Sequence, residues 1–379
     1  MTAFARHPAA RWLVPATAAA LVAGGTVAAR SADADPTLPP RTAAQLLVDV
    51  QKSDVTALSG TVEQAVDLGL PELPGLSGGG GAGGPSGGSS AGGAPSLTSV
   101  LSGTHTWRVW ADGPDRQRLA LVDGSAETAV VRDGRTAWLW SSADKSAVRY
   151  TLPAKDASKA PAPGDLPTDL PRTPQEAADR ALAALDPTTA VTTAGTATVA
   201  GRAAYELVLD PRTDATRVTQ VRLAVDAEEG VPLRVQVWSS KADEPVVDVG
   251  FTSVSFDRPA ASAFAFTPPE GATVSEGELP TAAERDAARS AEKPDAERPT
   301  VVGTGWSSVV VARLPDAPTA SGSDDPATAV LDALPRVSGD WGSGRLVDGT
   351  LVSVVLTDDG RVAVGAVPPS ALYAALARG

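Results

Sequence analysis

Apolar and polar residues alternate along several short segments in the second half of the chain. Every second position is apolar in 205–210, 221–226 and 231–237, and the positions between them include Glu206 and Arg222. This two-residue periodicity is typical of β-strands with one buried and one exposed face. The pattern therefore predicts a sheet that has one apolar face.

An antiparallel meander is predicted earlier in the chain. Asp-Gly pairs occur at 112–113, 123–124 and 133–134, between short apolar runs. These residues tolerate the positive φ angles of tight hairpin turns, so the pairs mark the ends of strands. The predicted strands of this first meander cover 105–111, 117–122, 127–131, 136–141 and 147–152.

The alternating segments form a second predicted meander. Glu229-Gly230 marks one of its hairpin turns, because a Gly after a short polar run favours a tight turn. A further strand, 58–68, is predicted before both meanders. The strands of the second meander cover 190–199, 203–210, 218–226, 231–239 and 246–256.

Two short helices accompany these strands. The first, 41–52, is amphipathic, and the second begins at Thr173, which forms a capping box with Glu176. Two helices are too few to cover so long a sheet, so the sheet must curl around them. The predicted fold class is mainly β with some α, with a sheet wrapped around helices and a partly open apolar interior.

The apolar face of this sheet is the candidate binding site. Burial of one methylene stabilises by about 0.8 kcal/mol, so a long acyl chain could contribute about 10 kcal/mol before ordering costs. The alternative is that these side chains pack on one another and on helix 173–185, which would leave no cavity. The candidate lining residues are Trp107, Val109, Trp138, Trp140, Tyr205, Leu207, Leu209, Val221, Leu223, Val225, Val235 and Val237.

The N-terminus carries a predicted export signal. Basic residues up to Arg11 precede an uncharged run of 18 residues, 12–29, and small residues at 27–29 and 32–34 offer cleavage sites. A basic region followed by such a run is typical of secretory signals. The alternative is that the run stays uncleaved as a membrane anchor. In both cases the rest of the chain is predicted to lie outside the cytoplasm.

Composition excludes several classes of chemistry. The chain has no cysteine and two histidines, so disulfides, thiol chemistry and multi-histidine zinc sites are excluded. Its 45 acidic and 32 basic residues leave a net charge of −13, without the basic patches of nucleic-acid-binding proteins. No nucleophile or phosphate-binding pattern occurs, so we expect no enzymatic activity and no cofactor. Glycine makes up 11 of the 19 residues of 75–93, which predicts a flexible loop, and 339–344 is predicted as another loop.

Three segments follow the order of the motifs of one known family. They are the hairpin Val131-Arg132-Asp133-Gly134-Arg135-Thr136-Ala137-Trp138-Leu139-Trp140, the strand 201–209 and the closing motif Phe264-Ala265-Phe266-Thr267-Pro268-Pro269-Glu270-Gly271. In these segments the chain resembles the LolA lipoprotein carriers. The resemblance implies an unclosed antiparallel half-barrel around a lid of helices, which binds acyl chains and catalyses nothing. It also implies that Arg118, with Arg116 as an alternative, makes a polar contact with the cavity or the lid. The other interpretation of both is an ordinary solvated arginine in a strand.

The C-terminal segment resembles the small second domain of the RseB/MucB regulators. The similar stretches are 305–315, 348–355 and 362–369, followed by a predicted helix, 370–377. Proteins of that family bind an anti-sigma factor in the cell envelope. The predicted organisation is a leader (1–34), a half-barrel domain (35–275, with a Gly-rich loop at 75–95), a linker (276–299) and a small C-terminal α+β domain (300–379).

These features lead to two main functional hypotheses. The first is an extracytoplasmic carrier or chaperone that binds an acyl lipid or a lipoprotein. The second is an RseB-like envelope sensor that controls an anti-sigma factor or another membrane partner. A structural module that faces the cell wall is a third hypothesis.

Overall fold

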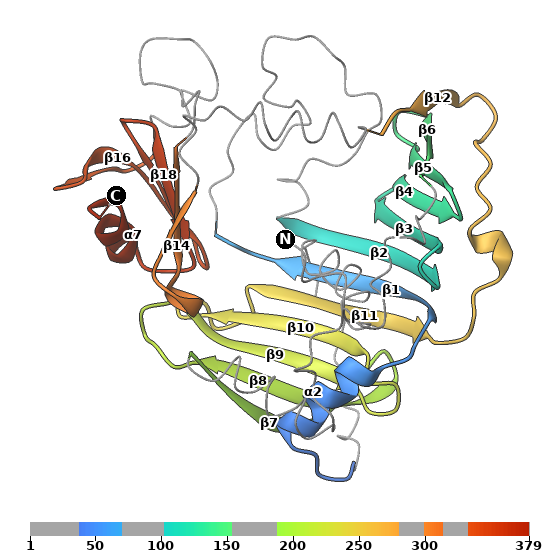
Figure 1. The fold of residues 1–379 in the computed structure, drawn as a ribbon, viewed down its shortest axis with the longest axis horizontal. Coiled ribbons are helices and arrows are strands. Elements are labelled where there is room, and N and C mark those ends of the chain that lie inside the picture. Colours follow the sequence, from blue (N-terminus) through green and yellow to red (C-terminus); the bar gives the residue numbers. More distant parts are fainter. Residues whose placement is uncertain (1–37, 70–101, 154–187, 280–298, 314–332, 379) are drawn as a thin grey trace, which may run out of the picture.

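A computed structural model describes residues 38–69, 102–153, 188–279, 299–313 and 333–378. Within these ranges the strands form one sheet of 12 strands and a separate sheet of six (Figure 1). The two edge strands of the large sheet do not pair with each other, so the sheet is an open half-barrel. This architecture confirms the predicted fold class. The Gly-rich loop predicted at 75–93 lies outside the described residues.

The large sheet contains both predicted meanders. Neighbouring strands of each meander pair antiparallel in chain order, and Gly113, Gly124 and Gly134 have φ angles of +70°, +55° and +59°. The glycine of each Asp-Gly pair therefore adopts the left-handed conformation that tight hairpin turns favour. The strands are β2 (Gly103–Asp112), β3 (Arg116–Asp123), β4 (Ala126–Asp133), β5 (Thr136–Ser141) and β6 (Ser146–Thr151), then β7 (Thr189–Val199), β8 (Arg202–Pro211), β9 (Val218–Asp226), β10 (Pro232–Ser239) and β11 (Val247–Ser255).

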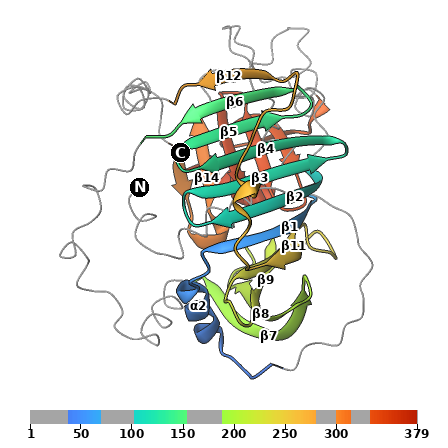
Figure 2. The same cartoon turned by 90° about the vertical axis from the view of Figure 1, so that its right-hand side faces the viewer.

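Strand β1 (Ala57–Val66) joins the two meanders into one sheet. It lies between β2 and β11 and pairs antiparallel with both (Figure 2). A Cβ atom at Gly60 would lie 2.3 Å from the backbone oxygen of Ser253, so this position accepts only glycine without a backbone shift. The sequence predicted the strand, and the structure shows that it is the central link.

The last strand of the large sheet corrects the purely antiparallel prediction. Strand β12 (Thr273–Gly277) runs parallel to β6, so this edge of the sheet is mixed. Residues 256–272, which include the closing motif, connect β11 to this edge of the sheet. Alternation along one strand does not reveal the direction of its neighbour, and for that reason the sequence missed this pairing. The predicted linker at 276–299 consequently begins inside a strand.

One described helix packs on the large sheet. Helix α2 (Ala43–Lys52) begins at Thr42, whose side chain accepts a hydrogen bond from the Gln45 backbone while the Gln45 side chain accepts one from Thr42. Leu46 is 1% exposed and packs against β8 and β9. The second predicted helix, 173–185, lies outside the described residues.

The small sheet has its own core. Helix α7 (Pro369–Leu376) packs on one side of it, and Leu372 and Val355 are completely buried. A separate core of this kind supports the separate sheet. The strand order is β13 (Thr300–Val302), β14 (Val309–Arg313), β18 (Arg361–Gly365), β17 (Ser353–Thr357), β16 (Gly342–Asp348) and β15 (Arg336–Gly339).

The loop predicted at 339–344 is in fact a β-hairpin. Strands β15 and β16 pair across Asp340 and Trp341, and Trp341 is 7% exposed. Its ring stacks on Tyr373 of α7, with centroids 5.5 Å apart. Glycine suits this hairpin because a Cβ at Gly344 would lie 2.3 Å from the Leu356 backbone oxygen. The glycines thus permit close strand contact here.

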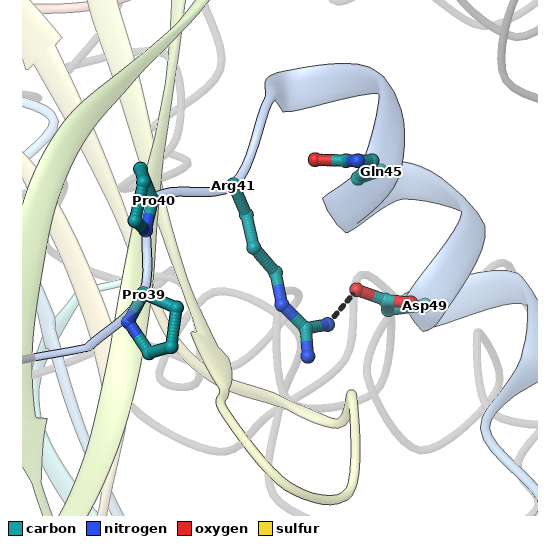
Figure 3. Close-up of a pocket in the computed structure, with 5 residues that line it drawn as sticks. All are labelled: Pro39, Pro40, Arg41, Gln45 and Asp49. Carbon is teal, nitrogen blue, oxygen red and sulfur yellow. Dashed lines mark hydrogen bonds and ion pairs between the residues drawn. The ribbon is translucent and has the colours of Figure 1, made fainter.

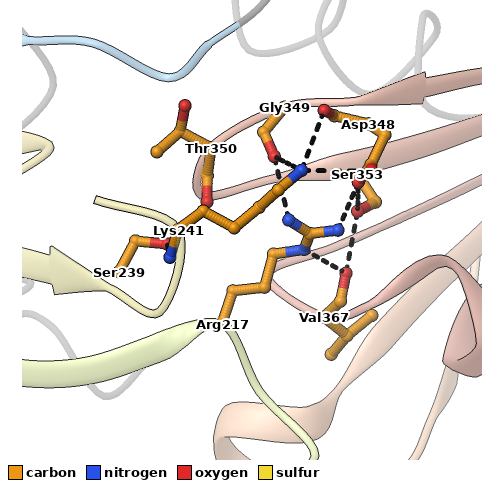
Figure 4. A network of polar contacts seen from close by, with 8 residues as sticks. All are labelled: Arg217, Ser239, Lys241, Asp348, Gly349, Thr350, Ser353 and Val367. Atoms are coloured by element: carbon orange, nitrogen blue, oxygen red, sulfur yellow. Dashed lines mark hydrogen bonds and ion pairs between the residues drawn. The ribbon is translucent and has the colours of Figure 1, made fainter.

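A polar junction connects the two sheets (Figure 4). Arg217, which precedes β9, is 5% exposed, and its Nε and Nη1 atoms donate to the backbone oxygens of Val367 at 3.1 Å and Gly349 at 3.0 Å. Its remaining nitrogen pairs with the carboxylate of Asp348. The hydrophobic clusters of the described residues each belong to one sheet only. The described part of the junction therefore depends on hydrogen bonds and charge.

Candidate functional site

The register of the strands divides the candidate residues between two faces of the large sheet. Directly opposed residues of an antiparallel pair point to the same face. Helix α2 packs on Leu207, and we name this side the α2 face. A continuous row leads from Leu207 across the sheet, through Leu223, Val235, Val249 and Gln64 to His105 in β2.

Ten of the twelve candidate lining residues lie on the α2 face. Trp107 stands two positions after His105 and directly opposite Val62, so it shares this face. The alternation within β8, β9 and β10 places the other members there. The ten residues are Trp107, Val109, Tyr205, Leu207, Leu209, Val221, Leu223, Val225, Val235 and Val237.

Trp138 and Trp140 lie on the opposite face. Trp138 is in register with Val131, and Val131 with Arg118, so these three share that face. Phe266 of the closing motif covers both tryptophans, with ring centroids 5.5 Å and 5.9 Å away. These two side chains therefore pack beneath the crossover and do not share a lining with Trp107. Alternation shows which residues of one strand share a face, but only the pairing register relates one strand to the next.

Arg118 is also directed away from the α2 face. Its Nη2 lies 3.1 Å from an oxygen of Glu127, and its guanidinium lies 5.2 Å from the ring centre of Trp110. A cation placed over an aromatic face and beside a carboxylate is stabilised by both. The alternative residue, Arg116, pairs with Asp112 and lies over Phe264. Among the described contacts, neither arginine touches α2.

Protein side chains fill the end of the α2 face near the helix. Leu46 of α2 packs on Tyr205, Leu207 and Val225, which are all buried. The hydroxyl of Tyr205 donates to the backbone oxygen of Pro39 at 2.8 Å. At this end, therefore, the candidate residues form core with α2, whereas helix 173–185, which the alternative interpretation named, lies outside the described residues.

A small pocket lies beside this end of the face (Figure 3). Its volume is about 400 Å³, and its lining includes Pro39, Gln45 and the ion pair between Arg41 and Asp49. The Arg41 guanidinium also lies 5.4 Å from the ring centre of Tyr205. Its walls are mostly polar, so the pocket lacks the apolar depth that an acyl chain requires.

The other end of the α2 face carries an apolar row that the sequence did not identify. By register, Val109 lies opposite Leu119, Leu119 opposite Val130, Val130 opposite Leu139, and Leu139 opposite Val148. We name these five residues the apolar row. Val130 is 48% exposed, which is unusual for an apolar residue surrounded by apolar neighbours. The Asp-Gly turns could have revealed the row, because a two-residue hairpin loop sets the register of both its strands.

The opposite face carries charge around β8–β10. Arg202 pairs with the buried carboxylate of Asp226, which also accepts backbone hydrogen bonds from Glu228 at 3.0 Å and Glu229 at 2.8 Å. Burial raises the pKa of Asp226, but these hydrogen bonds and the Arg202 charge outweigh it and lower the pKa below its ordinary value. The charged groups of this face make it less suited than the apolar row to an apolar ligand.

The described residues hold no group of three or more acidic or histidine side chains arranged to bind a metal ion. In the same ranges, no helix is long and apolar enough to span a membrane. The predicted signal or anchor, 12–29, falls outside them.

Comparisons with known proteins agree with this architecture. Residues 97–282 match the family model of the MucB/RseB N-terminal domain. No curated protein sequence matches the chain.

Solved structures similar to this chain include the complex of MucA and MucB from Pseudomonas aeruginosa, at 17% identity and a TM-score of 0.41, covering 88% of this chain and 96% of that one. An uncharacterised conserved protein from Thermus thermophilus is 12% identical, with a TM-score of 0.32 and coverage of 62% and 98%. A LolA superfamily protein from Nitrosomonas europaea is 10% identical, with a TM-score of 0.21 and coverage of 60% and 99%. The part of the chain that matches this family model, residues 97–282, supports its assignment to a LolA/RseB-type superfamily.

Proposed function

We propose that this protein is an extracytoplasmic binding protein whose half-barrel holds the acyl chain of a lipid or lipoprotein on the α2 face. The observation that carries the proposal is the apolar row, which crosses five strands and leaves Val130 48% exposed. Contiguous apolar surface is a feature of ligand-binding grooves. The superfamily and the predicted export signal both support a location outside the cytoplasm.

The physical basis of binding is the hydrophobic effect. Each methylene that leaves water for the apolar row contributes about 0.8 kcal/mol, so affinity rises with chain length rather than with headgroup contacts. A carrier needs this kind of interaction, because it must accept and release different molecules that share only an acyl chain. The function proposed for the row is therefore sequestration without chemical change.

The experiment is to purify the protein from its native host, extract it and identify the bound molecules by mass spectrometry. We expect an acyl lipid in stoichiometric amount. A Val130→Asp variant should lose it, because a charge in the row opposes burial of the chain. Val274, in β12, is 52% exposed, so Val274→Asp is a matched control and should keep the lipid. Absence of lipid from the wild-type protein would contradict the proposal.

A second candidate function is the regulation of a membrane partner, as in RseB/MucB proteins. A row of five valines on the small sheet favours it. Val301 faces Val310, and the row continues through Val364 and Val354 to Val347. Val301 is 61% exposed and Val310 41% exposed. By strand alternation they point away from the side on which Val309 packs with α7.

Cross-linking in the native host followed by purification tests this candidate. We expect a membrane protein to be recovered with the wild type and to be strongly reduced with Val310→Asp. Val274→Asp, on the large sheet, serves again as the control and should recover the partner normally. Equal recovery with both variants would exclude the valine row as the partner surface.

A further inference from the structure

The indole nitrogen of Trp107 is a buried hydrogen-bond donor for which the described residues supply no acceptor. The side chain is 9% exposed, its Nε1 atom is buried, and no acceptor in the described ranges lies within hydrogen-bond distance of it. Buried donors in folded proteins nearly always have a partner, so an unpaired one calls for a specific explanation. Because Trp107 lies on the α2 face, a bound ligand can supply the missing acceptor.

The surroundings of Trp107 are apolar. Val62 and Leu121 lie directly opposite it on the two neighbouring strands, and all three share one hydrophobic cluster with Val249. Val109, two positions further along β2, is the first residue of the apolar row and packs against the same cluster. The donor therefore stands at the β1–β2 end of the surface to which we assigned the acyl chain.

The unpaired nitrogens of Trp238 and Arg118 do not share this position. The Nε1 atom of Trp238 is also buried without an acceptor, but Trp238 is in register with Gln220, on the opposite face. The Nε atom of Arg118 belongs to a guanidinium that already pairs with Glu127 on that face. Of these three unpaired nitrogens, only that of Trp107 adjoins the apolar row.

We propose that Trp107 Nε1 donates a hydrogen bond to the carbonyl oxygen of an ester- or amide-linked acyl chain, and so fixes the orientation of the ligand. This inference rests on the proposed lipid-binding function. From β2 to β6 the row crosses four strand spacings of about 4.8 Å, which gives a track of about 19 Å. The carbonyl would lie at the β1–β2 end of the track and the tail would extend toward β6.

The chemistry of the donor selects a neutral carbonyl. An indole N–H donates one hydrogen bond and carries no charge. By register, the nearest residues on this face are Val62, Leu121, His105 and Val109, and none of them is Lys or Arg. His105 already has an interaction partner within the protein. A carboxylate or phosphate would favour a cationic partner, which these neighbours do not provide.

The test compares two ligands of equal chain length, methyl palmitate and hexadecane, by displacement of a fluorescent acyl probe from the full chain. We expect the wild type to bind the ester about three- to tenfold more tightly than the hydrocarbon, the increment of one hydrogen bond. In Trp107→Phe the two affinities should become nearly equal. Trp140→Phe is the matched control, because Trp140 is 8% exposed but lies on the opposite face, and it should preserve the preference.

A second measurement does not depend on the stability of the variant. In the ¹⁵N-labelled wild type, the indole resonance of Trp107 should shift on addition of methyl palmitate and shift less with hexadecane. This inference would be overturned if the wild type bound both ligands with equal affinity, or if the indole resonance of Trp107 did not shift on addition of methyl palmitate. Either result would leave the proposed function intact. A wild type that binds neither ligand would overturn both.

Discussion

The guanidinium of Arg217 is buried between the two sheets and forms an ion pair with Asp348 of the small sheet. Lys241 approaches the same carboxylate at 3.1 Å, and Ser239 donates to the backbone oxygen of Thr350 at 2.6 Å. Since the hydrophobic clusters of the described residues do not cross this boundary, the described contact between the sheets consists of hydrogen bonds and ion pairs, and Arg217 supplies three of them.

Substitution of Arg217 by alanine should weaken the junction. The change removes the Arg217 hydrogen bonds to the backbone oxygens of Gly349 and Val367 and the ion pair with Asp348, and we expect a loss of about 2–4 kcal/mol in unfolding free energy. Hydrogen exchange at Gly349 and Thr350 should increase, and thermal unfolding should separate into two transitions. Arg336→Ala is the control, because it removes an exposed ion pair with Asp358 and should change stability by less than about 1 kcal/mol. A single unchanged transition in Arg217→Ala would contradict the structural role of this residue.

Asp226 should make stability depend on pH in the acidic range. Its pKa in the folded protein is lowered, so its carboxylate contributes stability that is complete above the unfolded pKa, about 3.9, and is lost as pH falls through the folded value. We expect Asp226→Asn to destabilise the protein by about 3–5 kcal/mol at pH 7 and to flatten the acid limb of a plot of stability against pH. Denaturant unfolding between pH 2 and pH 7 measures both effects. The Glu228 side chain is 80% exposed, so Glu228→Gln should change little in either the stability at pH 7 or its dependence on acidic pH.

Gly60 should tolerate no side chain. The backbone oxygen of Ser253 occupies the place of its Cβ, so Gly60→Ala must displace β11 from β1, at a cost of about 1–3 kcal/mol. Thermal unfolding checks the loss. Gly250→Ala is the matched control in the neighbouring strand, because its Cβ would meet the flexible side chain of Arg234 at 2.8 Å and not the backbone. Equal losses in both variants would show that the close approach at Gly60 is not limiting.

Phe266 should matter for stability but not for the ligand. Its removal in Phe266→Ala exposes Trp138 and Trp140, and we expect a loss of about 1–3 kcal/mol. Lipid retention should remain, because the ring lies on the face opposite the apolar row. Parallel measurements of unfolding and bound lipid in this variant and in Val130→Asp should show opposite patterns. Loss of lipid in Phe266→Ala at a temperature where it is folded would contradict the division of the faces.

Local features of the sequence were sufficient to locate most strands. Asp-Gly turns and apolar alternation placed the ten meander strands within two residues of their observed bounds, because both signals depend on neighbouring residues only. Helix α2 was found through its amphipathic pattern. The hairpin around Trp341 was missed, because glycines that permit close strand contact look the same in a sequence as glycines of a loop.

The candidate site could be predicted only in part. Alternation correctly paired Trp138 with Trp140 and Trp107 with Val109, yet it could not show that the two pairs occupy opposite faces. The apolar row includes Val130, which no single strand pattern distinguishes from an ordinary surface valine. Only the pairing of Val130 with Leu119 of β3 and Leu139 of β5 shows that it belongs to a continuous apolar row.

The sequence by itself determined the strands, the turns and the apolar character of one side of each strand, since these follow from interactions between residues close along the chain. Only the tertiary structure decided which of those sides form a common surface, that β1 joins the two meanders and that β12 runs parallel to β6. The physical reason is that pairing between distant strands is selected by burial over the whole sheet, and a shift of one residue in register would exchange its two faces.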